Sequence, residues 1–254
     1  MKQSTRLYTT DSSHILLHTF HLLQNPLNTP PPPPPPRAST TMATSISQFI
    51  HNHPNNNNTH TVYRLTLFNH TIETLVTDTP SYVDTWISTI HHTHRHHLHS
   101  LIIGLDVEWR PNQTPNHQNP IATLQLCVGN HCLIFQILNS PSIPQSLINF
   151  LGNPSYTFVG VGIENDVEKL GLVVAKRVDL RSVAAYAYGG MEFKNAGLKQ
   201  LASMVLGWEI NKPKDVTMSG WDNKCLTPVQ VQYAAIDAFV SFEIGRVLIS
   251  GNRY

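Results

Sequence analysis

Two stretches early in the chain alternate apolar and polar residues, which is the period of a half-buried strand. Val62–Phe68 (VYRLTLF) has this pattern, and Thr71–Val76 (TIETLV) can pair with it across Asn69-His70. The next stretch, Pro80–His92, instead repeats its apolar residues at helical spacing. The side expected to be buried consists of Val83, Trp86, Ile87 and Ile90. The nearly continuous apolar run Leu101–Val107 then predicts a buried strand.

The remaining pattern interleaves strands and helices. Two strands, Ile121–Val128 and Cys132–Ile137, are expected to form a hairpin through Gly129-Asn130. The later elements are a helix at about Ser142–Leu151, a strand at Thr157–Val161, a helix that carries Asp166, and helices near Leu180–Tyr188 and Ala196–Leu206. This succession predicts an α/β fold in which helices cover both faces of a mixed β-sheet.

The last helix has the clearest start signal. Thr227 is an N-cap candidate, Pro228 suits the first helical position, and Gln230 completes a capping box. The residues expected to supply its buried surface are Val229, Ala234, Ile236, Val240, Ile244 and Val247. The helix is therefore expected to begin at Pro228.

Five residues in these elements form the candidate site. Asp106 and Glu108 lie two positions apart on a predicted strand, so they project from the same face. Tyr233 and Asp237 lie four positions apart on the last helix, so they also share a face. Asp166 belongs to the helix after the strand at Thr157–Val161. Carboxylates gathered in this way make a poor core and a good site for Mg²⁺ or Mn²⁺, which prefer hard oxygen ligands.

In their order and structural context, these motifs resemble the DEDDy branch of the DnaQ-like 3′–5′ exonucleases. Within that branch, the chain is most similar to the exonuclease module of Werner-syndrome-type proteins. The resemblance runs from Val62 to the C-terminus and rests on Asp-x-Glu in LDVEW, on GVGIEND before a helix, and on Tyr-x-x-x-Asp in a late helix. The segment Ile121–Phe135 also resembles the second and third strands of the family. The resemblance implies a ribonuclease-H-like fold and a metal-dependent 3′–5′ exonuclease that acts on nucleic acid.

The same resemblance implies a role for each site residue. The ligands of two divalent ions, Mg²⁺ or Mn²⁺, would be Asp106, Glu108, Asp166 and Asp237. Asp106 would bridge both ions, and such a pair stabilises the attacking and the leaving oxygen in phosphodiester hydrolysis. Tyr233 would orient the attacking water, because a phenol with a pKa near 10 is a weak base. The histidine variant of the family is not available, since Gln232 stands at the position that the histidine would need.

The first 59 residues differ in composition from the rest. Pro30–Pro36 is a run of seven prolines that favours an extended rod, and Asn55–Asn58 is a second low-complexity patch. Residues 1–59 are therefore predicted to be a disordered extension, and residues 60–254 an exonuclease domain. A weak organelle transit peptide and a ligand for a proline-binding partner are the alternatives for the extension. Met42 opens a second possible start.

Composition narrows the class of protein. The net charge of +1 gives no global signal for nucleic acid, so any basic track has to be local. Three cysteines, an odd number, argue against a disulfide framework and fit a reducing compartment. No apolar run reaches the roughly 20 residues that span a membrane, so no membrane partner is expected. The nucleus or cytoplasm is the expected location. Because the sequence has no Walker loop, any unwinding would come from a separate helicase chain.

Several site residues also have a simpler interpretation. Asp106 and Glu108 could be ordinary strand-end residues, and Tyr233 a half-buried core tyrosine. Asp166 could only favour a helix N-terminus, with Glu164 as the metal ligand instead.

Other chemistry-bearing residues remain open at this point. Trp109 could pack at the edge of the site or stack on a terminal base. His91–His99 and the set Cys127, His131 and Cys132 are two weaker zinc candidates, since neither has the usual interleaving of ligands. The lysines that could contact phosphates are Lys194, Lys199, Lys212, Lys214 and Lys224.

Two functional alternatives stand beside an active exonuclease. One is a nucleic-acid-binding module of the same fold with little turnover. The other is an RNA-trimming enzyme similar to ribonuclease D, which shares the chemistry and differs in substrate. The sequence leaves DNA and RNA open as substrates.

Overall fold

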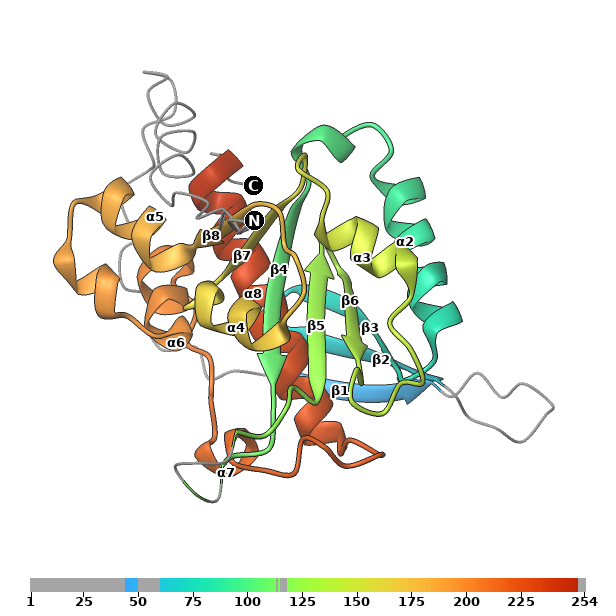
Figure 1. Cartoon of the computed structure of the whole chain (residues 1–254). Coiled ribbons are helices and arrows are strands. Elements are labelled where there is room, and N and C mark those ends of the chain that lie inside the picture. The colour runs from blue at the N-terminus through green and yellow to red at the C-terminus, as the bar shows by residue number, and fades with distance from the viewer. Residues whose placement is uncertain (1–43, 50–59, 113, 115–117, 251–254) are drawn as a thin grey trace, which may run out of the picture.

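The buried apolar run before Asp106 forms strand β4 (Ile102–Glu108), which lies inside an eight-stranded sheet (Figure 1). The computed structural model describes residues 44–49, 60–112, 114 and 118–250. The order of strands across the sheet is β1-β2-β3-β6-β5-β4-β7-β8. The other strands are β1 (Thr44–Phe49), β2 (His60–Leu67), β3 (His70–Thr77), β5 (Thr123–Val128), β6 (His131–Phe135), β7 (Thr157–Gly160) and β8 (Arg177–Asp179).

The sheet is mixed, as predicted. The pairs β3–β6, β4–β7 and β7–β8 are parallel, and the other neighbours are antiparallel. The predicted hairpin between β5 and β6 turns at Gly129-Asn130, where Gly129 has a φ of 56°. A residue without a side chain adopts this left-handed conformation at the lowest cost, which explains the position of the glycine.

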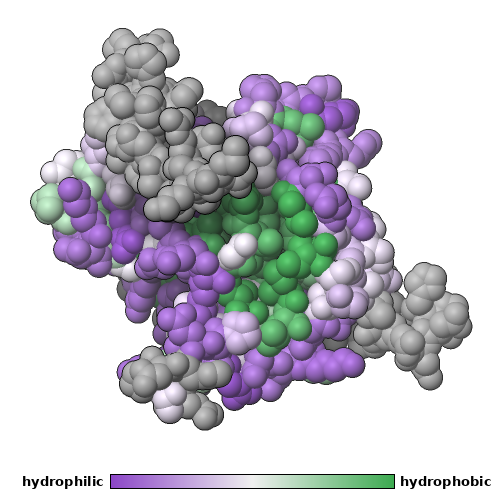
Figure 2. Space-filling view, viewed as in Figure 1, coloured by the Kyte–Doolittle hydropathy of each residue, from purple (hydrophilic) through white to green (hydrophobic). Residues whose placement is uncertain are grey.

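Helices cover both faces of the sheet. One face packs against α2 (Pro80–Thr93), α3 (Gln145–Leu151) and α4 (Ile163–Leu170). The other face packs against α5 (Leu180–Tyr188), α6 (Leu198–Leu201) and α8 (Pro228–Ser250), with α8 running behind the central strands in Figure 1. The shorter elements are η1 (Leu98–Ser100), η2 (Met191–Asn195), η3 (Ala202–Leu206) and α7 (Lys214–Thr217). Figure 2 shows hydrophobic residues at the centre of the face that carries α3 and α4, with hydrophilic residues around them.

Strand β4 divides its side chains between these two layers. Ile103, Leu105 and Val107 are almost fully buried in the cluster under α2, α3 and α4. Gly104 and Asp106 point to the opposite face, where α8 lies. At Gly104 the strand and the helix approach so closely that an added Cβ would lie 2.0 Å from the carbonyl oxygen of Ala238. This approach brings the end of β4 and the first half of α8 together.

The start of α8 follows the sequence prediction. The Thr227 N–H donates to Gln230 Oε1 (2.9 Å), and the Gln230 N–H donates to Thr227 Oγ1 (3.3 Å). These reciprocal bonds form the expected capping box. The predicted buried surface of α8 is wrong at one residue, because Val229 is 55% exposed. It lies in the first turn of the helix, where Gln230 and Val231 are buried, so Val229 is on the outer side of that turn.

Most predicted helices and strands are confirmed, and the structure contains several short elements that were not predicted. The inner side of α2 consists of the predicted Val83, Trp86, Ile87 and Ile90. Two short elements, β8 and α7, have only three and four residues and were not predicted. The strand β1 was not predicted either; it lies within the predicted extension and pairs with β2, so the sheet begins before residue 60. The proline run and Asn55–Asn58 lie outside the described residues.

The odd number of cysteines argued against disulfides, and this prediction is wrong for one pair. Cys127 and Cys132 face each other across the β5–β6 hairpin, with their Cα atoms 4.2 Å apart, and form a disulfide. The odd number of cysteines gave no information on this pair, because the register of a hairpin decides which side chains meet. Cys225 is free and exposed.

No helix in the described part of the chain is long and apolar enough to cross a membrane. The longest one, α8, contains Asp237, Glu243 and Arg246.

Gly104→Ala should destabilise the fold by about 3 kcal/mol, because the new methyl group would overlap the backbone of α8 and force the two elements apart. Urea denaturation followed by circular dichroism measures this loss. Gly197→Ala is the control, since a Cβ at Gly197 has no atom within 4 Å. It should change the free energy of unfolding by less than about 1 kcal/mol. Equal stability of the two variants would show that β4 and α8 are not in tight contact.

Candidate active site

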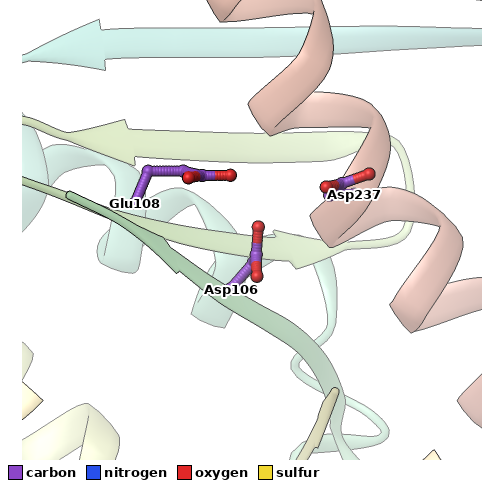
Figure 3. Close-up of side chains that lie close together, drawn as sticks. All are labelled: Asp106, Glu108 and Asp237. Carbon is purple, nitrogen blue, oxygen red and sulfur yellow. The ribbon is translucent and has the colours of Figure 1, made fainter. Parts of the chain in front are cut away.

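Three carboxylates from two elements meet at the contact between β4 and α8 (Figure 3). Asp106 and Glu108 come from the end of β4, and Asp237 comes from α8. Each offers one oxygen atom, and these oxygens lie within 4.8 Å of one another. The structure therefore brings together three of the four predicted metal ligands.

Burial and mutual repulsion change the acidity of the cluster. Burial, together with the charges of Asp106 and Asp237, raises the pKa of Glu108 to about 10. Burial and then the charge of Asp237 hold the pKa of Asp106 well above its usual range. Burial also raises the pKa of Asp237, although Lys212 and a hydrogen bond from Tyr233 oppose the effect. Without a divalent ion, the repulsion between like charges at this distance disfavours full ionisation, so the cluster keeps protons.

The arrangement fits a divalent metal ion. Asp106 Oδ2 is buried and has no hydrogen-bond partner, although a buried polar atom normally has one. Carboxylate oxygens are the ligands that Mg²⁺ and Mn²⁺ prefer, and a divalent charge would remove the repulsion within the cluster. Among the described residues, Asp106, Glu108 and Asp237 are the group of metal-binding side chains that lies close enough to hold an ion.

Asp166 lies in the first turn of α4, outside the three-residue cluster. Its charge nevertheless raises the pKa of both Asp106 and Glu108, so it belongs to the same electrostatic environment. Burial, with the charge of Asp179, raises the pKa of Asp166 itself to about 7. The alternative ligand, Glu164, is exposed and paired with Arg177 (Oε2 to Nε, 2.9 Å). Asp166 is thus the better placed of the two carboxylates.

Tyr233 is 7% exposed and lies one helical turn before Asp237. Burial and the charge of Asp237 raise the pKa of Tyr233 to about 12. The hydroxyl of Thr217, at the end of α7, donates to the Tyr233 oxygen at 3.0 Å. The phenol is therefore held in place and keeps its proton at neutral pH, which suits a group that orients a water and does not act as the base.

Lys212 also lies at the site. In the sequence it is one of five lysines that could contact phosphates, with nothing to distinguish it from the other four. Its Nζ lies 2.5 Å from Asp237 Oδ2 and 5.0 Å from the centre of the Tyr233 ring. Burial alone would lower the pKa of Lys212, but the negative charges of Asp237 and Asp106 outweigh it and raise the pKa. The other four candidates, Lys194, Lys199, Lys214 and Lys224, are exposed. No periodic pattern marks Lys212, since it lies in the connection before α7.

Trp109 directly follows β4 and is partly buried in the cluster under α2, α3 and α4. Lys169 Nζ lies 4.7 Å from the centre of its indole ring, so a cation already occupies one face of the ring. The two zinc candidates have no support among the described residues, because neither the histidines nor the hairpin cysteines form a group that could hold an ion. The disulfide itself removes Cys127 and Cys132 as ligands.

The comparisons with known proteins agree with this geometry. Residues 78–248 match the family model described as 3'-5' exonuclease. A 3'-5' exonuclease of Arabidopsis thaliana is 35% identical over 152 residues, which are 58% of this chain and 52% of the relative. The bifunctional 3'-5' exonuclease/ATP-dependent helicase WRN of Mus musculus is 35% identical over 148 residues, which are 56% of this chain and 10% of the relative. This chain thus spans about half the length of the first relative and a small part of the second.

A solved structure supports the fold. Escherichia coli RNase D, described as an exoribonuclease involved in structured RNA processing, superposes with a TM-score of 0.53 and 22% identity. The match covers 66% of this chain and 42% of RNase D. At this identity the similarity concerns the fold, and it confirms the predicted ribonuclease-H-like architecture.

Asp166→Asn should reduce the pH dependence of stability in the absence of divalent ions. The folded-state pKa of about 7 is above the usual value of 3.8, so the folded protein holds this proton more tightly than the unfolded chain does. The resulting stabilisation is complete below about pH 4 and is lost as the pH rises through about 7. The wild type should therefore lose about 2 kcal/mol more than the variant between pH 4 and pH 8.

Urea denaturation in EDTA at a series of pH values measures this difference. Asp215→Asn is the matched control, because Asp215 is an exposed carboxylate in α7. Its pH profile should follow that of the wild type. If the pH profile of stability of Asp166→Asn coincides with that of the wild type, Asp166 is not part of the electrostatic environment of the cluster.

Proposed function

The chain belongs to the 3′–5′ exonuclease family, and we propose that it hydrolyses phosphodiester bonds at the 3′ ends of nucleic acids, using divalent metal ions. One observation carries the proposal: Asp106, Glu108 and Asp237 place an oxygen each within 4.8 Å, beside Tyr233. We propose that this set is the tyrosine version of the site, which is the version of the DEDDy branch. A binding module without turnover would have no need to keep buried carboxylates that repel one another.

The chain's own residues would have different roles in the reaction. Asp106, Glu108 and Asp237 would hold the ions, with Asp166 as the fourth ligand. Two ions, Mg²⁺ or Mn²⁺, would supply Lewis acidity toward the phosphate and lower the pKa of the attacking water. Asp106 would be the central ligand, since it has an unpartnered oxygen and lies between Glu108 and Asp237 in Figure 3.

Tyr233 would orient the attacking water. Its proton is retained up to about pH 12, so it can hold a water by hydrogen bonding but does not take a proton from it at neutral pH. Thr217 fixes the phenol from α7, and Tyr233 is also hydrogen-bonded to Asp237. A water held by Tyr233 therefore lies next to a metal ligand, where it can be activated.

The proposed substrate is a polynucleotide with a 3′ end, and DNA and RNA are both candidates. Trp109 is proposed to contact the terminal base through the edge or the face that Lys169 does not cover. The name of the mouse relative combines an exonuclease with a helicase. For this chain we propose a separate helicase as partner when the substrate is duplex, and the nucleus or cytoplasm as location.

Asp106→Asn and Asp237→Asn should each reduce hydrolysis by more than about 1,000-fold, because each removes a charged ligand without changing the shape of the side chain. The assay follows the shortening, with Mg²⁺ or Mn²⁺, of 5′-labelled strands in single-stranded DNA, a 3′-recessed duplex and single-stranded RNA. A ladder that shortens from the 3′ end identifies the polarity, and the three substrates separate a deoxyribonuclease from an RNA-trimming enzyme. Asp215→Asn, an exposed carboxylate, should keep wild-type turnover.

Tyr233→Phe should slow the chemical step by roughly 10- to 1,000-fold, which corresponds to the loss of one positioned hydrogen bond of about 1.4–4 kcal/mol in the transition state. The ring and its packing remain, so substrate affinity should stay close to wild type. Single-turnover cleavage at saturating Mn²⁺ separates the two effects. A Phe variant that cleaves at the wild-type rate would make Tyr233 a packing residue.

A further inference from the structure

Lys212 places a positive charge inside the carboxylate cluster. Its Nζ lies 2.5 Å from Asp237 Oδ2, and the Asp237 side chain is only 4% exposed. The Lys212 side chain is 29% exposed, so its stem reaches the cluster from the surface. A buried carboxylate without a partner is costly, and the ammonium lowers this cost by pairing with it.

The same carboxylate is part of the candidate metal site. Asp237 contributes one of the oxygens that converge with those of Asp106 and Glu108. A lysine ammonium in direct contact with this carboxylate and a divalent ion bound by it carry charge of the same sign at short range. Close cations repel each other, so both cannot occupy the immediate surroundings of Asp237 with full affinity.

We propose that Lys212 is an exchangeable counter-ion of the active site, which pairs with Asp237 when no divalent ion is bound and turns to the substrate phosphate when one is bound. The second position of Lys212 is suggested by its surroundings. The ammonium lies over the Tyr233 ring, at 5.0 Å from its centre, so it is next to the residue proposed to orient the water that attacks the phosphate. This part of the inference rests on the proposed function.

The position of Lys212 in the chain allows such a movement. It lies in the connection between η3 and α7, directly before Pro213, and not on a regular helix or strand. Its side chain has a flexible stem of four carbons, whereas Asp237 is fixed by α8. A change of side-chain rotamer moves the ammonium away from Asp237 while the carboxylates stay in place.

Binding of Mn²⁺ tests the exchange without any need for catalysis. Lys212→Met keeps the length and apolar stem of the side chain but removes the charge, so Mn²⁺ should bind about threefold to tenfold more tightly than to the wild type in isothermal titration. Lys212→Arg keeps the charge and should bind Mn²⁺ no more tightly than the wild type. Lys214→Met, a change of an exposed lysine two residues away, should leave the affinity within about twofold.

Thermal unfolding supplies the second measurement. In EDTA, Lys212→Met should melt several degrees below the wild type, because the carboxylates have lost their cation. With saturating Mn²⁺ the difference should disappear, which also shows that the variant folds. A lower melting temperature in both conditions, or an affinity for Mn²⁺ that is unchanged or weaker, would overturn the proposal and leave Lys212 a structural residue.

The substrate side of the proposal has its own readout. At saturating Mn²⁺, Lys212→Met should cleave about tenfold more slowly or bind substrate about tenfold more weakly, and Lys212→Arg should recover part of this loss. Wild-type turnover by Lys212→Met would overturn the phosphate contact. If the wild type binds Mn²⁺ but hydrolyses none of the tested polynucleotides, the proposed function fails, while the binding data still decide the exchange at Asp237.

Discussion

The contact between β4 and α8 at Gly104 is the constraint on which the rest of the structure depends. The strand and the helix meet backbone to backbone there, with no room for a side chain. Two residues further along β4 is Asp106, and one residue before Ala238 is Asp237, so the close approach sets the distance between these two carboxylates. A second close contact, between Gly245 and Val159 of β7, holds the far half of α8 against the sheet in the same way. The position of the site is therefore a consequence of how the core packs.

The buried carboxylates of the site reduce the stability of the fold. Asp106, Glu108 and Asp237 are withdrawn from water at the edge of an apolar cluster, which favours their protonated forms. Lys212 offsets part of this repulsion, and the protons retained by the acids offset another part. The fold can tolerate this cost because its stability comes from two apolar layers, one on each face of the sheet. Three acidic side chains and one lysine thus meet at one point of a chain in which residues of the charged types are only 13% of the total.

The features that could be predicted from the sequence are those with a local pattern. Alternation and helical spacing identified most strands and helices, and the period of two along β4 was enough to place Asp106 and Glu108 on one face. The spacing of four on α8 did the same for Tyr233 and Asp237. The capping box could be identified because its hydrogen bonds join residues within one turn.

The remaining features depend on long-range geometry that no local pattern records. Lys212 reaches the site only because of the path that the chain takes between η3 and α7. The strand β8 is three residues long, too short for a period, and β1 is defined by its pairing with β2. The meeting of Cys127 with Cys132 follows from the hairpin register. The exposure of Val229 has a similar origin, because helical spacing alone does not say which residues of the first turn of α8 are covered by the rest of the chain.

The separation of the site residues along the chain has a consequence for the biosynthesis of the protein. Asp106 is on the fourth strand, whereas Tyr233 and Asp237 are on the last helix that the structure describes, so a long stretch of sequence lies between them. Contacts between residues so distant in sequence form late, since the loop between them has to close first. A nascent chain that has emerged from the ribosome only as far as α7 already contains Asp106, Glu108 and Asp166, but it lacks Tyr233 and Asp237. The set of residues that forms the site is therefore complete only after synthesis has passed α8 and that helix has docked on the sheet.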